Sequence, residues 1–225
     1  MLDTQVAELT RFLAPHVYAC VTADYVVFLD IRRNAFLGVA HGCVGTPALS
    51  EEMLKQGMLS TEASTRAPIR FHSPVGALFE GFVPFREPIT FGLLANTALA
   101  FLSAWLAVRT GNVERCVRHA TERAERRRPR PEPALDGFSV PQDLQRLVSA
   151  YFHCRAWLVS TAGKCLLDSL ALTTFLSRYG IAASLTIGVR TAPFGAHAWV
   201  QRDGLVLNDQ CEIVCAYDCI FASRP

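Results

Sequence analysis

Three side chains in the last third of the chain have the types and the order of a thiol catalyst. Cys165 opens an apolar, helix-like run, His197 lies in the strand-like run 196–200, and Asp209 follows another short apolar run. In such a set the thiolate attacks a carbonyl, the histidine exchanges the proton and the acid orients the imidazole. The chemistry that these residue types can perform is acyl transfer through a thioester.

The stretch around Cys165 has the pattern of a helix that would activate the thiol. Ser160 and Thr161 are suitable N-cap residues, Gly180 is a suitable C-terminal stop, and apolar residues recur between them at helical spacing. Cys165 then lies near the first turn, where free backbone N–H groups and the helix dipole favour a thiolate. We therefore expect a reactive cysteine at this position.

The hairpin after His197 decides whether the histidine can meet Asp209. A three-residue loop, 202–204, with a left-handed Gly204 places His197 directly opposite Asp209. A two-residue turn, Asp203-Gly204, shifts the register by one and sends the two side chains to opposite faces. The catalytic hypothesis therefore predicts the three-residue loop.

Each of the three residues also has a structural interpretation. A single cysteine in an apolar helix is usually a small buried hydrophobe. A histidine before an Ala-Trp-Val strand is often a core residue, and Asp209 after Asn208 is compatible with simple turn chemistry. The order, the spacing and the helix-end placement together favour the catalytic interpretation.

Residues 154–209 resemble the transglutaminase-like peptidase domain of lasso-peptide B proteins. The residues that carry the resemblance are Cys165, Leu166, Ser169, Leu170, Ala171, Leu172, Phe175, Leu176, Arg178, Gly180, Ile181, Ile187, Gly188, Val189, Pro193, Phe194, Ala196, His197, Ala198, Trp199 and Val200. The resemblance implies removal of the leader from a ribosomally made precursor peptide before an asparagine-synthetase-like cyclase closes a macrolactam. It also implies Cys165 as nucleophile, His197 as base and later acid, and Asp209 as the residue that orients the imidazole. It implies no cofactor in this chain, with any ATP dependence arising through the cyclase.

The N-terminal region has the pattern of a three-stranded β-meander. Runs of β-branched and aromatic residues at 16–21, 25–30 and 35–39 are separated by turn residues, and a helix is expected over 48–59. The 29–33 segment, followed by an aromatic, resembles PqqD-like leader-recognition domains. That resemblance implies leader binding along the third strand and the following helix, through Ala35, Phe36, Leu37, Val39, Met53 and Leu54. The family has about three helices after the meander, so the domain here is either shortened or completed by later helices; alternatively the meander only packs on the peptidase.

These elements predict an α+β chain of three regions. Residues 1–65 form a winged-helix or PqqD-like recognition region, and residues 66–135 form a connector and helical region that ends in an Arg/Pro-rich linker. Residues 136–225 form a papain- or transglutaminase-like peptidase core. The charge-free stretch 90–108 is expected to be a buried helix that continues as a charged helix toward residue 128, with a membrane span or peripheral membrane contact as alternatives.

Composition excludes several other classes of protein. A net charge of +2 and a basic run without interleaved aromatics give no reason to expect nucleic-acid binding. The eight cysteines include no CxxC pair, and no signal peptide is visible, so we expect a cytoplasmic protein with reduced thiols and no metal. The function expected is a leader-removing cysteine peptidase. A transglutaminase or other acyltransferase with the same triad, and a non-catalytic leader-binding adaptor, remain as alternatives.

Overall fold

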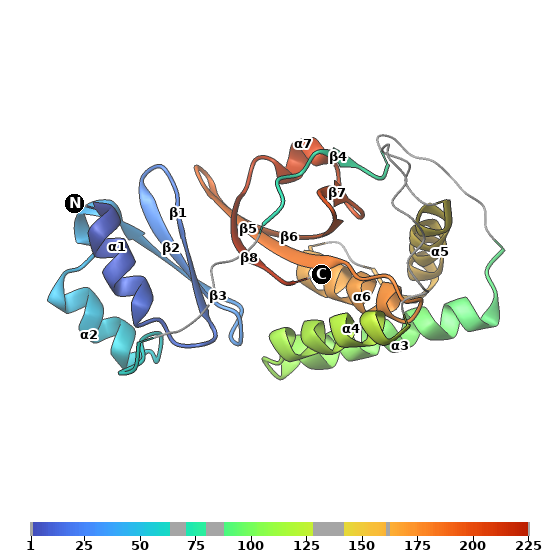
Figure 1. Cartoon of the computed structure of the whole chain (residues 1–225), viewed down its shortest axis with the longest axis horizontal. Coiled ribbons are helices and arrows are strands. Elements are labelled where there is room, and N and C mark those ends of the chain that lie inside the picture. The colour runs from blue at the N-terminus through green and yellow to red at the C-terminus, as the bar shows by residue number, and fades with distance from the viewer. Residues whose placement is uncertain (1, 64–70, 80–87, 128–141, 161–162, 225) are drawn as a thin grey trace.

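The computed structural model describes residues 2–63, 71–79, 88–127, 142–160 and 163–224 and has a mixed α+β architecture (Figure 1). The N-terminal elements are α1 (Leu2–Arg11), β1 (Val17–Val21), β2 (Tyr25–Asp30), β3 (Ala35–Ala40), the 3-10 turn η1 (His41–Cys43) and α2 (Pro47–Lys55). Then follow β4 (Gly76–Ala77), α3 (Phe91–Arg109), α4 (Val113–Arg127), α5 (Gln142–Leu158) and α6 (Cys165–Ser177). The last elements are β5 (Ser184–Thr191), β6 (Phe194–Arg202), β7 (Leu205–Val206), α7 (Cys211–Val214) and β8 (Asp218–Ala222).

The N-terminal sheet is the antiparallel meander β1-β2-β3 that the sequence predicts. Its strand β2 is buried on both faces, because successive side chains point to opposite sides of a sheet. Val26 and Phe28 pack in a core with α1 and α2, whereas Val27 and Leu29 pack in the core of the C-terminal elements. The meander therefore lies between its own helices and the rest of the fold, as Figure 1 shows.

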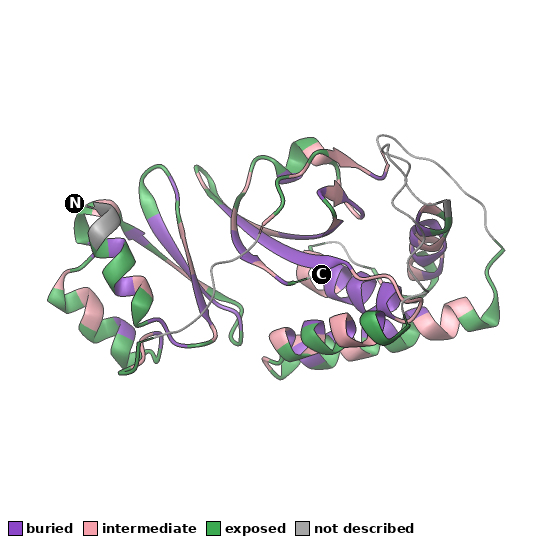
Figure 2. Ribbon diagram, viewed as in Figure 1, coloured by how far each residue is buried: buried purple, intermediate pink, exposed green. Residues whose placement is uncertain are grey.

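The second sheet, in the order β4-β7-β6-β5-β8, positions the residues of interest. Helix α6 is apolar on all sides, and such a helix is stable only when it is surrounded. Its residues from Asp168 to Ser177 are all buried, and they share one core with β5 and β6 and with α3, α4 and α5. Figure 2 shows this core as the continuous buried band along α6 and β5.

The helical middle differs from the single long helix expected from the sequence. Thr90 caps α3 by accepting the N–H of Leu93 at 3.2 Å, but α3 ends at Arg109 and a separate α4 begins at Val113. Gly111 makes the break with φ +67°, and a Cβ there would lie 2.6 Å from the carbonyl oxygen of Arg32. The predicted continuous helix is therefore wrong, because the N-terminal unit packs against the turn.

Other boundaries agree with the sequence only in part. Helix α1 was not expected, and α2 occupies 47–55 rather than 48–59. The Arg/Pro-rich linker and much of the connector lie outside the described residues. The division at 65 and 135 stays a prediction, although the shared core of α3, α4 and α6 crosses the second boundary.

Candidate active site

Cys165 is the first residue of α6, so the thiol lies at the helix N-terminus. The N-cap is Lys164, whose side chain makes no capping hydrogen bond, and the preceding Gly163 has φ +70°. The expected helix start at Ser160 or Thr161 is therefore wrong, because the left-handed glycine separates that segment from α6. The correction places the thiol even nearer the unpaired N–H groups of the first turn.

The hairpin between β6 and β7 does not have the predicted three-residue loop. Arg202 pairs with Leu205, and the two residues between them, Asp203 and Gly204, have φ values of +52° and +83°. Two left-handed residues are the mark of the tight two-residue hairpin turn. By strand alternation alone, this register would put His197 and Asp209 on opposite faces.

His197 and Asp209 nevertheless meet, with 2.6 Å between Nε2 and Oδ2. The reason is that β7 ends at Val206, so the alternation of a strand does not extend to Asp209. Beyond that point the side-chain oxygen of Asn208 accepts the N–H of Val200 at 2.7 Å, in place of a backbone carbonyl. The chain after Val206 therefore leaves the strand geometry, and the side chain of Asp209 lies on the same side as that of His197.

The early end of β7 also leaves one edge of β6 available to α6. Ser169 donates from its hydroxyl to the carbonyl oxygen of Ala198 at 2.9 Å. Asn208 donates from its side-chain amide to the same Ser169 hydroxyl, also at 2.9 Å. The N–H of Ala198 in turn hydrogen-bonds the sulfur of Cys165. This network of Ser169, Ala198 and Asn208 ties the helix with the thiol to the strand with the histidine.

Cys165 and His197 form a hydrogen-bonded pair that favours the charged form of both groups. The hydrogen bond from His197 lowers the pKa of Cys165, and the N–H groups of Ala198 and Leu166 add to this effect against the cost of burial. Hydrogen bonds to Asp209 and then to Cys165 raise the pKa of His197 to about 9. Both shifts favour the thiolate–imidazolium form of the pair over the neutral form.

Asp209 stays ionised beside the histidine. Burial by itself raises the pKa of Asp209, but the hydrogen bond from His197 and the N–H of Gln210 outweigh it and lower the pKa overall. Because Nε2 is held by Asp209, the other ring nitrogen, Nδ1, is left to face Cys165. The three predicted residues thus lie in the chain of contacts that a thiol acyl-transfer catalyst needs.

The histidine ring is also held by aromatic neighbours. Its centroid lies 6.2 Å from that of Trp199 and 5.4 Å from that of Tyr217. Gly188 lies opposite His197 on β5, and a Cβ there would be 2.7 Å from Cβ of Tyr217 and 2.9 Å from the ring of Trp199. Glycine at this position lets the aromatic residues close around the imidazole.

Comparison with known proteins places this arrangement in a family. The profile of the transglutaminase-like superfamily matches residues 97–221, which include all three residues of the site. The chain belongs to the transglutaminase-like superfamily. It is also 51% identical over 45 residues to the microcin J25-processing protein McjB of Escherichia coli, a match that spans 20% of this chain and 22% of that protein. No solved structure matches.

A second polar group supports α6 of this transglutaminase-like fold and was not expected from the sequence. Asp168 is buried one turn after Cys165; it accepts the hydroxyl of Tyr151 at 2.8 Å and pairs with Arg155. Burial is the largest influence and raises the pKa of Asp168, while Arg155 and Tyr151 oppose it. Tyr151 and Arg155 are four residues apart and therefore lie on one face of a helix. This spacing is too common in helices to have predicted the group from the sequence.

Four other cysteines of the transglutaminase-like chain differ from Cys165. Burial raises the pKa of Cys20 to about 11 and that of Cys219 to about 12, and it also raises the pKa of Cys116 and Cys154. Burial and raised pKa values are typical of structural thiols. Among the described residues no group of three His, Cys, Asp or Glu side chains could hold a metal ion.

The predicted leader-binding residues fall into two groups. Ala35, Phe36, Leu37 and Val39 lie on β3, which pairs only with β2 in the described part of the chain. Met53 is fully buried in the core under the meander, so it supports that surface without being exposed on it, whereas Leu54 is exposed. Whether this surface binds a leader stays a prediction.

We expect Asn208→Ala to weaken both stability and activity of the transglutaminase-like domain. The change leaves the N–H of Val200 without an acceptor and removes the donor to the Ser169 hydroxyl, which costs about 1–3 kcal/mol of the free energy of unfolding. Urea denaturation measures the stability, and turnover of a thioester-forming substrate measures the activity. Asn208→Asp is the matched control, because it keeps the acceptor for Val200 and should lose less. Unchanged unfolding in both variants would show that the network does not join α6 to β6.

Proposed function

We propose that this chain is a cysteine peptidase that removes the leader from a ribosomally made lasso-peptide precursor. The observation that carries the proposal is the placing of Cys165 at the start of α6 beside His197, whose Nε2 lies 2.6 Å from Oδ2 of Asp209; the hydrogen bond from His197 lowers the pKa of Cys165. Membership of the transglutaminase-like superfamily supports thioester chemistry. The partial match to a microcin J25-processing protein supports a peptide precursor as the substrate.

The reaction proceeds in two steps. The thiolate of Cys165 attacks the carbonyl of the last leader residue, and backbone N–H groups at the start of α6 stabilise the oxyanion. His197 gives its proton to the leaving amine, which releases the core peptide with a free N-terminus. His197 then takes a proton from water as the water attacks the thioester, and this frees the leader as a carboxylate and restores the thiol pair.

Partners and location follow from the same proposal. The precursor peptide is the substrate, and an asparagine-synthetase-like cyclase consumes the released core by closing the macrolactam. This chain needs no cofactor of its own, and ATP is used by the cyclase. The enzyme works in the cytoplasm, where its thiols stay reduced.

The leader binds by adding a strand to the outer edge of β3, which pairs with no other strand among the described residues, in the PqqD-like recognition region, residues 1–65. The N–H of Thr22 donates to Tyr25 across the first hairpin, and that of His41 donates to Asp24 across the second. The backbone N–H groups of an edge strand point alternately toward its partner and away from it. Since the N–H of His41 points toward β2, those of Phe36, Gly38 and Ala40 point away from β2. These free groups could pair with an extended peptide.

Gly38→Pro should weaken leader binding without disrupting the meander. Proline removes one outward N–H and adds a ring at the edge, so leader affinity should fall about tenfold or more. Leu37→Pro would be a poorer test, because the N–H of Leu37 points toward β2. Titration of a fluorescent leader peptide measures the affinity, and thermal unfolding checks the fold. Gly38→Ala is the control, since its Cβ meets nothing within 4 Å; equal loss in both variants, or in neither, argues against strand addition.

Incubating the precursor with the protein in H₂¹⁸O, followed by intact-mass spectrometry, tests the proposed reaction. Hydrolysis releases the core and adds one ¹⁸O to the new carboxylate of the leader. Transfer to an added primary amine without ¹⁸O uptake would instead identify an acyltransferase. If the precursor stays intact even with the cyclase and ATP, while the leader still binds, the chain is a non-catalytic adaptor and the proposal is wrong.

A further inference from the structure

Helix α3 carries a long apolar face that the fold leaves uncovered. Its inner side, with Ala100, Phe101 and Ala104, is buried against the core. Its outer side is apolar as well, and the exposed residues lie at helical spacing on one stripe: Phe91, Ala98, Leu99, Leu102, Trp105 and Leu106. Phe91 is 86% exposed, and each of the four larger side chains that follow is about half exposed. The stripe follows ~23 Å of helix, which is far more than the scattered apolar residues of an ordinary surface.

The helix does not cross a membrane in this fold. Among the described residues, α3 is the one helix with the length and composition for a span. However, its inner side packs on α6 in the core of the fold, so only the outer side can meet another apolar phase. The face therefore suits a surface on which the helix would lie flat.

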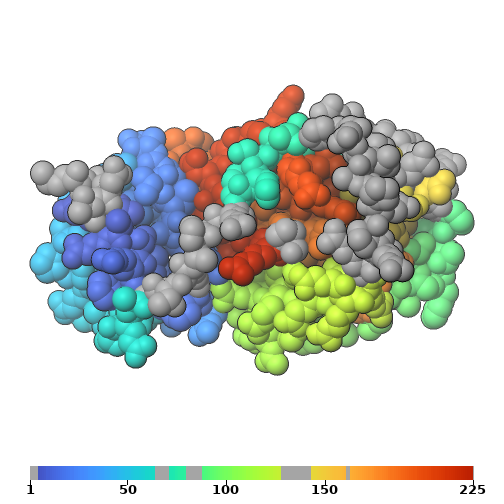
Figure 3. All heavy atoms as spheres, in the orientation of Figure 1, coloured from blue at the N-terminus to red at the C-terminus, as the bar shows by residue number. Residues whose placement is uncertain are grey.

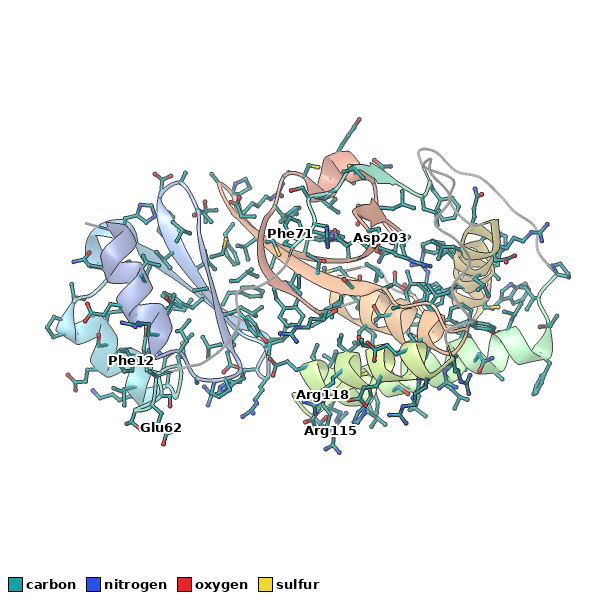
Figure 4. The ribbon with its side chains drawn as sticks, in the orientation of Figure 1. Phe12, Glu62, Phe71, Arg115, Arg118 and Asp203 are labelled. Atoms are coloured by element: carbon teal, nitrogen blue, oxygen red, sulfur yellow. The ribbon has the colours of Figure 1, made fainter. Side chains whose placement is uncertain are left out.

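Positive charge lies beside the apolar stripe. The guanidinium of Arg109 lies over the ring of Trp105, 5.2 Å from the ring centroid. Arg115 and Arg118 project from the neighbouring α4 away from the rest of the fold, as Figure 4 shows. Helix α3 itself carries no acidic residue. Helix α4 carries three glutamates against five arginines. Glu114 accepts the hydroxyl of Tyr18, and Glu122 lies 3.3 Å from Arg126, so two of the three acidic side chains are engaged and a positive excess remains.

A basic hollow of about 320 Å³ lies on the second half of α4 and is lined by His119, Arg123, Arg126 and Arg127. Arg127 donates to the carbonyl of Arg178 at 2.6 Å, and the Arg178 side chain reaches Asn96 of α3 at 3.4 Å. These contacts place the hollow next to α3. The surface formed by α3 and α4 is seen along the lower edge of the molecule in Figure 3.

We propose that the α3–α4 face binds the surface of an anionic phospholipid bilayer. The stripe from Phe91 to Leu106 enters the boundary between headgroups and acyl chains, and the arginines of α4 meet the lipid phosphates. A second copy of the chain would bring like charges together along this face, because α4 is basic. A bilayer with negative headgroups satisfies the apolar and the positive parts at once.

The test is flotation of the full chain with two kinds of vesicle at low ionic strength. We expect the protein to float with vesicles of phosphatidylcholine and phosphatidylglycerol, and to bind pure phosphatidylcholine at least tenfold less. Raising the salt to 0.5 M should reduce the binding, because it screens the arginines. Equal binding to both vesicles, or no binding to either, would overturn the proposal.

Two sets of variants locate the surface. Leu102→Glu combined with Leu106→Glu should lower vesicle binding at least tenfold, as should Arg115→Glu combined with Arg118→Glu. Val75→Glu, at an exposed apolar residue outside this face, is the matched control and should bind as the wild type does. All these side chains are exposed, so circular dichroism should show unchanged folding. Full binding by both double variants contradicts the proposal, and so does a dimer in light scattering that the leucine variants abolish while no vesicles are bound.

Discussion

We expect Cys165→Ala to abolish the proposed release of the leader and to leave binding of the precursor unchanged. Without the sulfur no thioester can form, so the rate of cleavage should fall by at least about 10³-fold. The fold should be retained, because Cys165 is only partly buried and alanine favours helices. Intact-mass spectrometry follows the precursor over time, and titration of a labelled leader gives the affinity in the same preparation.

Cys215→Ala is the matched control, since this thiol is exposed and its loss should not change the rate. A leader that is still removed by Cys165→Ala would rule out the thioester route through this residue. The combination of lost cleavage with retained affinity separates a peptidase from an adaptor, because an adaptor would support maturation equally well with either residue at 165.

Asp209→Ala should reduce the rate between about 10²- and 10⁴-fold and change its pH dependence. The proposed reaction needs Cys165 deprotonated and His197 protonated. The rate of the wild type therefore rises with pH through the lowered pKa of Cys165 and falls as the pH passes the His197 pKa of about 9. The hydrogen bond to Asp209 is the largest cause of that raised pKa. Its removal moves the alkaline limb to lower pH.

The pH–rate profile of the cleavage reaction measures both limbs, and Asp203→Asn is the control. Asp203 is an aspartate in the exposed hairpin turn with φ +52°, a conformation that asparagine tolerates, so its replacement should leave rate and profile as they are. An Asp209→Ala enzyme with a lower rate but an unmoved alkaline limb would mean that Asp209 supports the local structure without setting the charge of His197.

The sequence was informative where the pattern is local. β-branched and aromatic runs predicted the three strands of the N-terminal meander, and the structure confirms them within one residue. The helical spacing after Cys165 predicted α6, although Gly163 delays its start. Side-chain periodicity and turn residues act over a few positions, so such elements are encoded close to where they form.

The hairpin shows where local inference fails. The glycine in the turn is compatible with two loop lengths, and the choice between them depends on how the flanking strands twist and pair. The sequence also gave no sign that β7 stops after two residues, or that Asn208 takes the place of a strand partner. The expected contact of His197 with Asp209 occurs, but by a different route from the one predicted.

The sequence by itself determined several elements and the candidate catalytic side chains of this protein: the meander, the helix that begins near Cys165, and the order of cysteine, histidine and aspartate. Only the tertiary structure decided the register of the hairpin, the break at Gly111 and the uncovered face of α3. The physical reason is that these features depend on contacts between segments far apart in the chain. The N-terminal unit contacts the turn between α3 and α4 at Gly111. The early end of β7 lets Ser169 of α6 hydrogen-bond Ala198 of β6. Neither contact follows from the spacing of nearby residues.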